Sequence, residues 1–231
     1  MEISRDNHSF IEIGAMFMDT LIIKQKYYET VANTIIQNFK KRQIEGYYCQ
    51  DKASALKKAL ELIPKGASIS WGGSMTIIET GLLDAVKNGD YTVIDRDKAT
   101  TLDEQRKIYG EICCSDFFLM STNAITLDGE LINIDGRGNR VAFLCYGPQN
   151  VLILVGINKI VSDVESGFKR IRDIASPQNA IRLNRDTPCK ILGRCKDCYC
   201  TDCMCGQFVI TRRSIIPNRI KVILIGEELG Y

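Results

Sequence analysis

The amino-acid sequence predicts an α/β protein built as three layers, with helices covering both faces of a mostly parallel sheet. Short apolar runs alternate with helical segments over the first half of the chain, and this alternation is typical of parallel strands joined by crossover helices. Capping residues mark several helix starts, for example Asp51 and the pair Thr101 and Glu104. With 231 residues and 45% hydrophobic composition, the chain can bury one large core.

The first expected element is an amphipathic helix over residues 19–42, since its apolar residues recur at intervals of three, four and seven. The residues before it, 1–18, are expected to form an irregular N-terminal segment. Further helices are expected over 51–63, 74–89, 101–114 and 162–175. Strands are expected over 46–50, 67–71, 91–95, 117–121, 140–147, 151–156, 207–213 and 220–226. A hairpin is expected over 124–135, around an Asp-Gly turn.

Residues 19–231 are therefore expected to form a single domain. A cysteine-rich insertion at 189–205 interrupts it, and the strands on either side return to the main sheet. Lys and Arg number 30 against 28 Asp and Glu, without a long basic tract, so nucleic-acid binding is not expected. No apolar run is long enough to span a membrane. The N-terminal residues do not resemble a secretion signal, which favours a cytoplasmic protein.

Two stretches concentrate residues that could bind a ligand. In "SWGGSMTIIETG", a strand ends at Trp71, two glycines expose backbone N–H groups, and Ser74 opens a helix whose N-terminus carries partial positive charge. This pattern predicts a phosphate or carboxylate site at the carboxyl edge of the sheet, although a tight strand-to-helix turn is the simpler alternative. It is not a P-loop, because no lysine follows the glycines.

The second stretch, "STNAITLDGELINIDGRGNRVA", gathers Asn, Asp and Arg around glycines at strand ends. Arg137 and Arg140 could together hold an anion through paired hydrogen bonds. Asn-Asp-Gly-rich segments are also what ordinary hairpin turns contain, and that reading stays open.

These stretches, with "GINKI", "TPC" and the terminal "VILIGEELGY", resemble the lactate-utilisation (LUD domain) family from about residue 20 to the end. The resemblance implies a Rossmann-like sheet similar to the sugar-phosphate isomerase and coenzyme A transferase superfamily. It also implies a role as a subunit or accessory of a multi-protein iron–sulphur system that oxidises L-lactate to pyruvate. In that superfamily the corresponding loops line a pocket for a small anionic molecule. The ligand-binding candidates carried over are Gly72, Gly73, Ser74, Thr122, Asn123, Asp128, Gly129, Asp135, Gly136 and Arg137.

Whether the chain is an enzyme stays open, because no catalytic residue is carried over with the resemblance. Coenzyme A transferases attack with a glutamate, and Glu79 and Glu130 lie nearest to the two stretches; both are expected to be exposed. The only histidine, His8, lies in the N-terminal segment, which excludes a histidine-based triad. Lys159 in "GINKI" could reach the pocket, but a lone lysine after a strand is expected to be solvated. The alternatives are a stand-alone transferase or isomerase acting on a phosphorylated or coenzyme A-linked molecule, and a non-catalytic ligand-binding protein.

Six of the ten cysteines lie in "CKILGRCKDCYCTDCMC". Two pairs are separated by two residues, a spacing that lets both sulfurs bind one metal. Because thiolates suit zinc and an iron–sulphur cluster equally, both remain possible cofactors, beside free thiols and disulfides. The resemblance implies Cys189, Cys195, Cys198 and Cys205 as ligands, with Cys200 and Cys203 as extras. The other four cysteines, Cys49, Cys113, Cys114 and Cys145, are expected to be small core residues.

Overall fold

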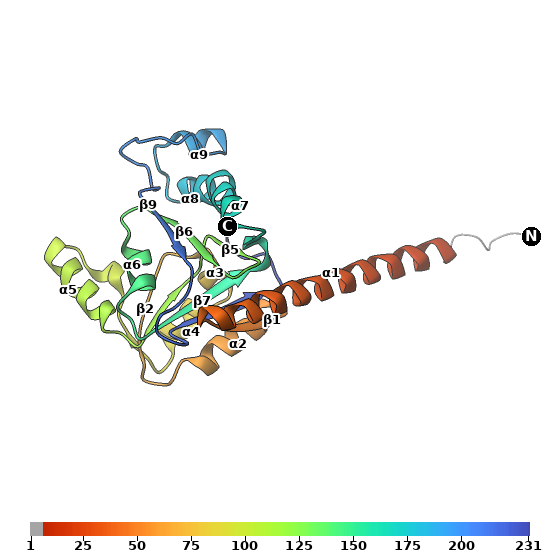
Figure 1. The fold of residues 1–231 in the computed structure, drawn as a ribbon, viewed down its shortest axis with the longest axis horizontal. Helices are drawn as coiled ribbons and strands as arrows, with labels where there is room; N and C mark the ends of the chain where they lie inside the picture. The colour runs from red at the N-terminus through yellow and green to blue at the C-terminus, as the bar shows by residue number, and fades with distance from the viewer. Residues whose placement is uncertain (1–6) are drawn as a thin grey trace, which may run out of the picture.

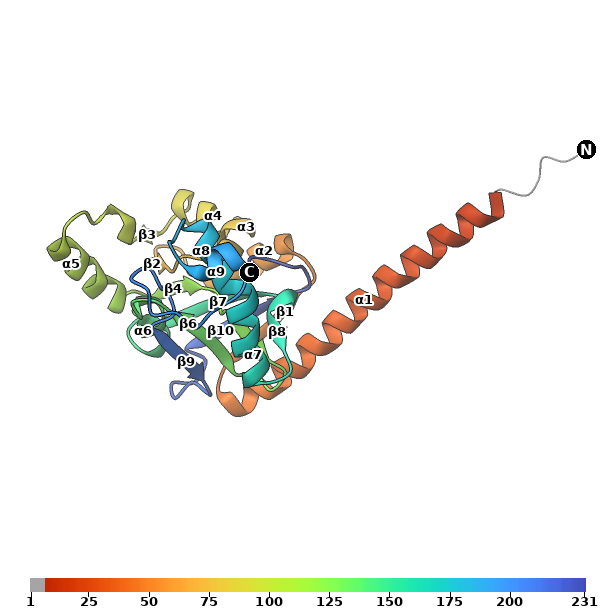
Figure 2. The same ribbon diagram turned by 90° about the horizontal axis from the view of Figure 1, so that it is seen from above.

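The structure is a computed structural model that describes residues 7–231, with side chains described from Thr20 onward. Its centre (Figure 1) is a six-stranded sheet in the order β1-β10-β7-β4-β2-β3, and Figure 2 labels all six strands. All neighbouring strands in it are parallel. The strands are β1 (Glu45–Cys49), β2 (Ser68–Trp71), β3 (Thr92–Val93), β4 (Phe117–Met120), β7 (Asn150–Gly156) and β10 (Ile220–Ile225). β4, β7 and β10 read as continuous apolar runs because helices cover both of their faces.

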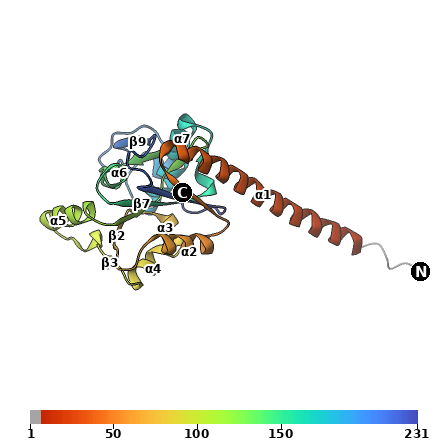
Figure 3. The same ribbon diagram turned by 60° about the horizontal axis from the view of Figure 1, so that its bottom comes forward.

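Two hydrophobic cores lie on opposite faces of this sheet. One face is covered by α2 (Lys52–Leu62), α3 (Met75–Glu79) and α4 (Leu82–Asn88). The other is covered by the C-terminal part of α1 (Asn7–Arg42), by α5 (Leu102–Cys113) and by α6 (Asn139–Cys145). Figure 3 shows α2, α3 and α4 on one side of the strands and α1 and α6 on the other. The predicted three-layer α/β architecture is therefore confirmed.

A second, smaller sheet has the order β8-β5-β6-β9. It contains β5 (Ala124–Thr126) and β6 (Leu131–Asp135), the antiparallel hairpin predicted around the Asp-Gly turn. β8 (Ile160–Val161) and β9 (Gln207–Thr211) complete it. α7 (Val164–Arg170) and a π-helical turn (Ile171–Ala175) pack against this sheet, and α8 (Ser176–Arg182) and α9 (Pro188–Leu192) follow (Figure 1). The expected return of both flanks of the cysteine segment to the main sheet is thus wrong for β9.

α1 is longer than predicted. The helix already begins at Asn7, so the irregular segment expected over 1–18 is wrong for residues 7–18; residues 1–6 lie outside the described part. This stretch contains no proline, and a single glycine within a helix costs only about 1 kcal/mol relative to alanine. The first half of α1 projects beyond the rest of the molecule (Figures 1 and 2), which leaves Leu21, Ile22 and Ile23 exposed.

Residues 140–147 form α6 and a following turn, where a buried strand was expected. A short apolar run does not distinguish a strand from a buried helix by periodicity alone. The buried guanidinium of Arg219 donates hydrogen bonds to the carbonyls of Phe143, Leu144 and Pro148. Carbonyl groups at and just after the C-terminal end of α6 thereby gain the partners that the helix itself does not provide. This partner is 71 to 76 residues away in the chain, so no local pattern indicates it.

Three smaller differences concern helix breaks and cysteines. The helix expected over 74–89 divides into α3 and α4 because Gly81 adopts a left-handed φ of 75°. The helix expected to stop before Pro177 continues into α8, since proline is tolerated in the first turn. Cys113, Cys114 and Cys145 are exposed rather than in the core, whereas Cys49 is buried as expected.

Within residues 7–231, no helix combines the length and the apolar character needed to cross a membrane.

Candidate functional site

A cavity of about 600 Å³ opens where the central sheet meets the smaller sheet. Its walls come from the residues after β2 (72–75), the residues after β4 (121–123), the end of β6 (134–137), Lys159 and the inner side of α8. β2, β4 and β7 are parallel and end at the same edge of the sheet. Ligands of open α/β sheets bind at this carboxyl edge.

Eight of the ten predicted ligand-binding residues line this cavity. They are Gly72, Gly73, Ser74, Thr122, Asn123, Asp135, Gly136 and Arg137. Asp128 and Gly129 lie elsewhere: the Asp128 carbonyl accepts a hydrogen bond from Arg42 Nε at 2.7 Å, and Gly129 packs against Phe39 on α1. Asp128 and Gly129 lie away from the cavity because the β5–β6 turn that contains them is at the opposite end of these two strands.

The glycine-rich turn allows a close approach to Arg140. A Cβ atom on Gly72 would lie 3.2 Å from the Arg140 side chain, while the Gly72 N–H continues the sheet by donating to Leu119 O at 2.9 Å. Ser74 caps α3, its Oγ accepting from Ile77 N. α3 has only five residues, so few peptide dipoles add up at its N-terminus. The positive character of the cavity must therefore come from side chains.

Arg140 joins the residues after β4 to the end of β6, within the second stretch, instead of facing a ligand. Its NH1 donates to Ser121 O and Asn133 Oδ1, and its NH2 donates to Asn123 Oδ1 and Ile134 O, at 2.5 to 3.2 Å. Its Nε lies 3.3 Å from Asp135 Oδ2. These contacts occupy the guanidinium, so the expected paired anion clamp by Arg137 and Arg140 is wrong for Arg140. Arg137 is exposed at the cavity wall, and its guanidinium has no hydrogen-bond or ion-pair partner among the side chains described, those of residues 20–231.

Lys159 is buried at the base of the cavity, with 3% of its surface exposed, although it was expected to be solvated. A short 3-10 turn over Ile157–Lys159 after β7 directs it inward. Its Nζ donates to Thr76 Oγ1 at 2.8 Å and to Ser121 Oγ at 3.0 Å. Within the described chain, no carboxylate lies within ion-pair distance of this amine.

This environment lowers the pKa of Lys159 to about 7. Burial is the main cause, because it penalises the charged ammonium, and the positive charges of Arg170 and Arg140 add to it. The Lys159 amine is therefore divided between its neutral and protonated forms near neutral pH. Sequence reasoning raised Lys159 as a residue that could reach the pocket but favoured a solvated side chain, because nothing local distinguishes a lysine that turns inward after a strand from one that turns outward.

Cationic side chains outnumber acidic ones around the cavity. The cationic residues lining it are Arg96, Arg137, Arg140, Lys159, Arg182 and Arg185, and the acidic ones are Asp97 and Asp135. A concave surface dominated by one sign of charge attracts ions of the opposite sign. The arrangement favours a small anion whether or not Lys159 carries a proton.

Neither glutamate considered as a transferase nucleophile lines this cavity. The carboxylate of Glu79 accepts a hydrogen bond from Gly230 N at 2.7 Å. Glu130 is half-buried rather than exposed, and its carboxylate pairs with Arg42 at 2.5 Å beside the hairpin turn. The expected exposure of Glu130 is thus wrong, because α1 packs over this turn.

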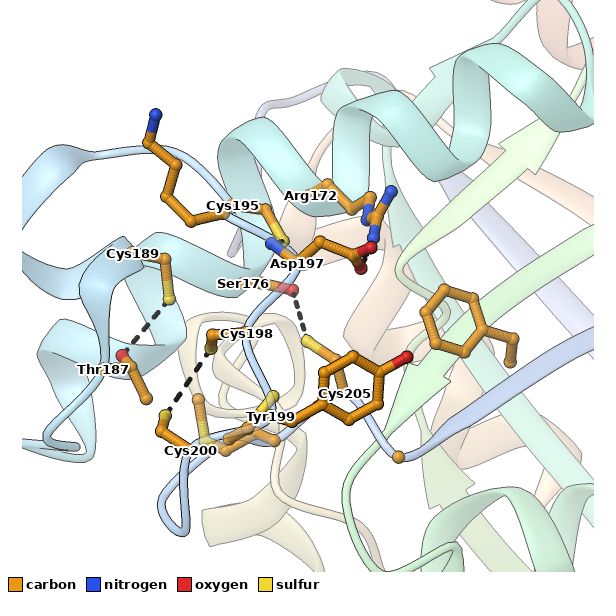
Figure 4. Close-up of a pocket in the computed structure, with 15 residues that line it drawn as sticks. Arg172, Ser176, Thr187, Cys189, Cys195, Asp197, Cys198, Tyr199, Cys200 and Cys205 are labelled. Atoms are coloured by element: carbon orange, nitrogen blue, oxygen red, sulfur yellow. Dashed lines mark hydrogen bonds and ion pairs between the residues drawn. The ribbon is translucent and has the colours of Figure 1, made fainter.

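A second cavity, of about 390 Å³, lies beside the first and is lined by all six clustered cysteines. Figure 4 shows several of these thiols around the 195–205 loop. Sγ of Cys198 lies 3.5 Å from Sγ of Cys200, and Sγ of Cys205 lies 3.6 Å from Ser176 Oγ. Ser176 and Met204 line both cavities, so the two share a wall.

The donor types in this second cavity suit zinc or an iron–sulphur cluster, since both take thiolate ligands. The cysteines are not arranged as a preformed site: among the side chains described, those of residues 20–231, no three of Cys, His, Asp or Glu are grouped as metal ligands. All six are free cysteines. Burial raises the pKa of Cys203 to about 11, so a metal would have to displace the proton of this thiol.

The model of the LUD domain family matches residues 32–225 of this chain. The chain belongs to the LUD domain family. This confirms the resemblance inferred from the sequence and assigns the protein to a domain associated with lactate utilisation. No curated protein matches the chain.

Among solved structures, this LUD domain protein is similar to a DUF162 family protein from Deinococcus radiodurans, with a TM-score of 0.51 and 13% identity. That match covers 86% of this chain and 98% of the other. A weaker match, with a TM-score of 0.35 and 18% identity, is eIF2B delta from Chaetomium thermophilum, over 73% of this chain and 60% of that one. At this level of identity the first similarity concerns the fold alone.

Proposed function

We propose that this LUD domain protein binds a small anionic metabolite in the cavity beside Lys159. We further propose that it acts in lactate utilisation as a subunit or accessory of an iron–sulphur system that oxidises L-lactate to pyruvate. The observation that carries the proposal is the excess of cationic side chains around a cavity whose buried lysine has no acidic partner. The cavity volume is within the range of small-molecule sites, roughly 300–1,000 Å³.

Arg137 is the side chain best placed to bind the anion. It is exposed to the cavity, and no group of the described chain occupies its guanidinium. Gly73 leaves exposed backbone on the cavity wall, and Asn123 presents its amide beside it. These groups would bind the carboxylate or phosphate, while Arg140 keeps the walls in place.

Thermal unfolding with a panel of anions tests this part of the proposal. L-lactate, pyruvate, a sugar phosphate and a coenzyme A ester are compared, and at least one should raise the melting temperature. A ligand at about 100 times its Kd stabilises the native state by about 2.7 kcal/mol. Arg137→Ala should weaken binding of that ligand by about 10- to 150-fold, since a hydrogen bond to a charged group contributes about 1.5–3 kcal/mol. The exposed Arg213→Ala is the control. A melting temperature that none of these anions changes would contradict the proposal.

The cofactor proposed for the second cavity is an iron–sulphur cluster or zinc, bound by Cys189, Cys195, Cys198 and Cys205, with Cys200 and Cys203 available as additional thiols. The gathering of six sulfurs around one cavity supports it. A cluster there would supply one-electron transfer next to the anion cavity, whereas zinc would stabilise the 189–205 loop. Ser176 and Met204, in the shared wall, would separate the metal from the anion.

Metal analysis of anaerobically purified protein tests the cofactor. Iron with inorganic sulfide and broad visible absorption is expected for a cluster, and zinc in colourless protein for the alternative. Cys198→Ser should reduce the metal content, whereas serine at the exposed Cys113, outside the cluster, should leave it unchanged. Protein free of both metals, with all ten thiols reactive in the unfolded state, would rule the cofactor out.

A further inference from the structure

We propose that Lys159 forms a reversible imine with the carbonyl carbon of a small 2-oxo acid whose carboxylate is bound by the arginines of the cavity. The inference rests on the proposed anion binding and adds to it the class of ligand and a covalent step. The nucleophilic group is the buried amine of Lys159, which forms no ion pair among the described residues that would give it a purely structural role.

The geometry around the Lys159 amine supports a reactive role. Its Nζ has two neutral partners, Thr76 Oγ1 and Ser121 Oγ, and both hydroxyls also contact backbone carbonyls, those of Leu229 and Thr122. A structural buried lysine usually has a carboxylate partner, because an unpaired ammonium is costly to bury. This amine instead faces a cavity lined by arginines.

The charges around Lys159 keep part of the amine unprotonated at neutral pH. Arg170 on α7 and Arg140 on α6 disfavour its protonation, and Glu79 on α3 favours it less strongly. Burial acts in the same direction as the arginines, and the pKa is about 7. Desolvation and neighbouring cations are the two means by which proteins make a lysine nucleophilic toward carbonyl groups.

The ligand must then offer both an anion and a carbonyl. Arg137 and Arg182 line the cavity and could hold a carboxylate, while Lys159 lies at the base where an adjacent carbonyl would be placed. A 2-oxo acid has these two groups on neighbouring carbons. A 2-hydroxy acid has the carboxylate without the carbonyl, so it would bind without reacting.

The step balances without an oxidant. The neutral Nζ attacks the carbonyl carbon, the C=O double bond becomes a C–O single bond, and the oxygen takes a proton to give a carbinolamine. That oxygen leaves as water after a second proton is added, and the nitrogen loses its protons as the C=N bond forms. The hydroxyls of Thr76 and Ser121, each hydrogen-bonded to Nζ, can pass protons between nitrogen and oxygen. Hydrolysis reverses the step.

Reductive trapping tests the inference on the full-length protein. Sodium cyanoborohydride is added with pyruvate, with L-lactate, or with glyceraldehyde 3-phosphate, and the products are measured by intact mass and peptide mapping. With pyruvate, one adduct per chain is expected, on Lys159. Lactate should give none, since it lacks a carbonyl. Lys159→Arg should abolish the adduct, and arginine at the exposed Lys65 should leave it unchanged, with melting curves checking that both variants fold.

Three results would overturn the inference. The first is pyruvate adducts spread over exposed lysines without preference for Lys159. The second is a specific adduct with the aldehyde phosphate alone, which would exclude a 2-oxo acid as the ligand. The third is a raised melting temperature with pyruvate but no adduct, which would refute the imine while leaving anion binding intact. If the proposed anion binding itself were wrong, none of the anions would raise the melting temperature, and this outcome is different from the three above.

Discussion

Replacing Arg140 by methionine should lower the free energy of unfolding by about 3–5 kcal/mol, the range measured when one partner of a buried ion pair is removed. The Asp135 side chain is only 10% exposed, and Arg140 is its ion-pair partner. The same substitution also removes hydrogen bonds to Asn123 and Asn133. Asn133 Nδ2 already lacks a partner, so this buried amide would lose its main anchor.

Urea unfolding monitored by circular dichroism measures this loss. Arg213→Met, at an exposed position, should change stability by less than about 0.5 kcal/mol. Arg140→Lys separates charge from geometry, since lysine keeps the charge but cannot form the forked contacts of a guanidinium. We expect this variant to be destabilised as well. An Arg140→Met variant as stable as the wild type would show that this network does not stabilise the junction between residues 121–123 and β6.

The buried Lys159 should make stability rise with pH above neutrality. In the folded protein its pKa is about 7, against an ordinary value of 10.5. Between these values the unfolded chain binds a proton that the folded chain does not, so the free energy of unfolding increases with pH in this window. The slope due to this one group approaches about 1.4 kcal/mol per pH unit. Below pH 7 the cost of burying the charge is fully present, and above the ordinary pKa it vanishes.

Comparison with Lys159→Met isolates this effect, because methionine is of similar length and does not titrate. The stability of wild type relative to the variant should increase steadily from about pH 7.5 to 9.5. Thr76 and Ser121 keep their backbone contacts in the variant, so the replacement should not leave a buried hydroxyl unpaired. A pH-independent difference between the two proteins would mean that Lys159 titrates at its ordinary pKa.

Local sequence signals predicted much of the fold. Asp51 and Thr101 do cap α2 and α5 through capping boxes, and the Asp-Gly turn does close the β5–β6 hairpin. Strands buried on both faces, such as β7, were predicted because they read as unbroken apolar runs. These features depend on residues close together in the chain, where hydrogen-bonding and apolar patterns are local.

The errors share a different cause. α6 depends on Arg219, which reaches it from just before β10, and the burial of Lys159 depends on Thr76 and Ser121 from two other segments. In these two cases a contact between distant segments decided the outcome. Asp128 was carried over with the family resemblance, and it lies away from the cavity because a hairpin places its turn and its open end far apart.

A crystal structure of the protein grown with pyruvate tests the central claim most directly. We expect density for the ligand in the cavity between Gly73 and Lys159, with its carboxylate within hydrogen-bond distance of Arg137. An empty cavity at saturating pyruvate, or a ligand bound only outside the residues that line it, would contradict the assignment of this cavity as the binding site.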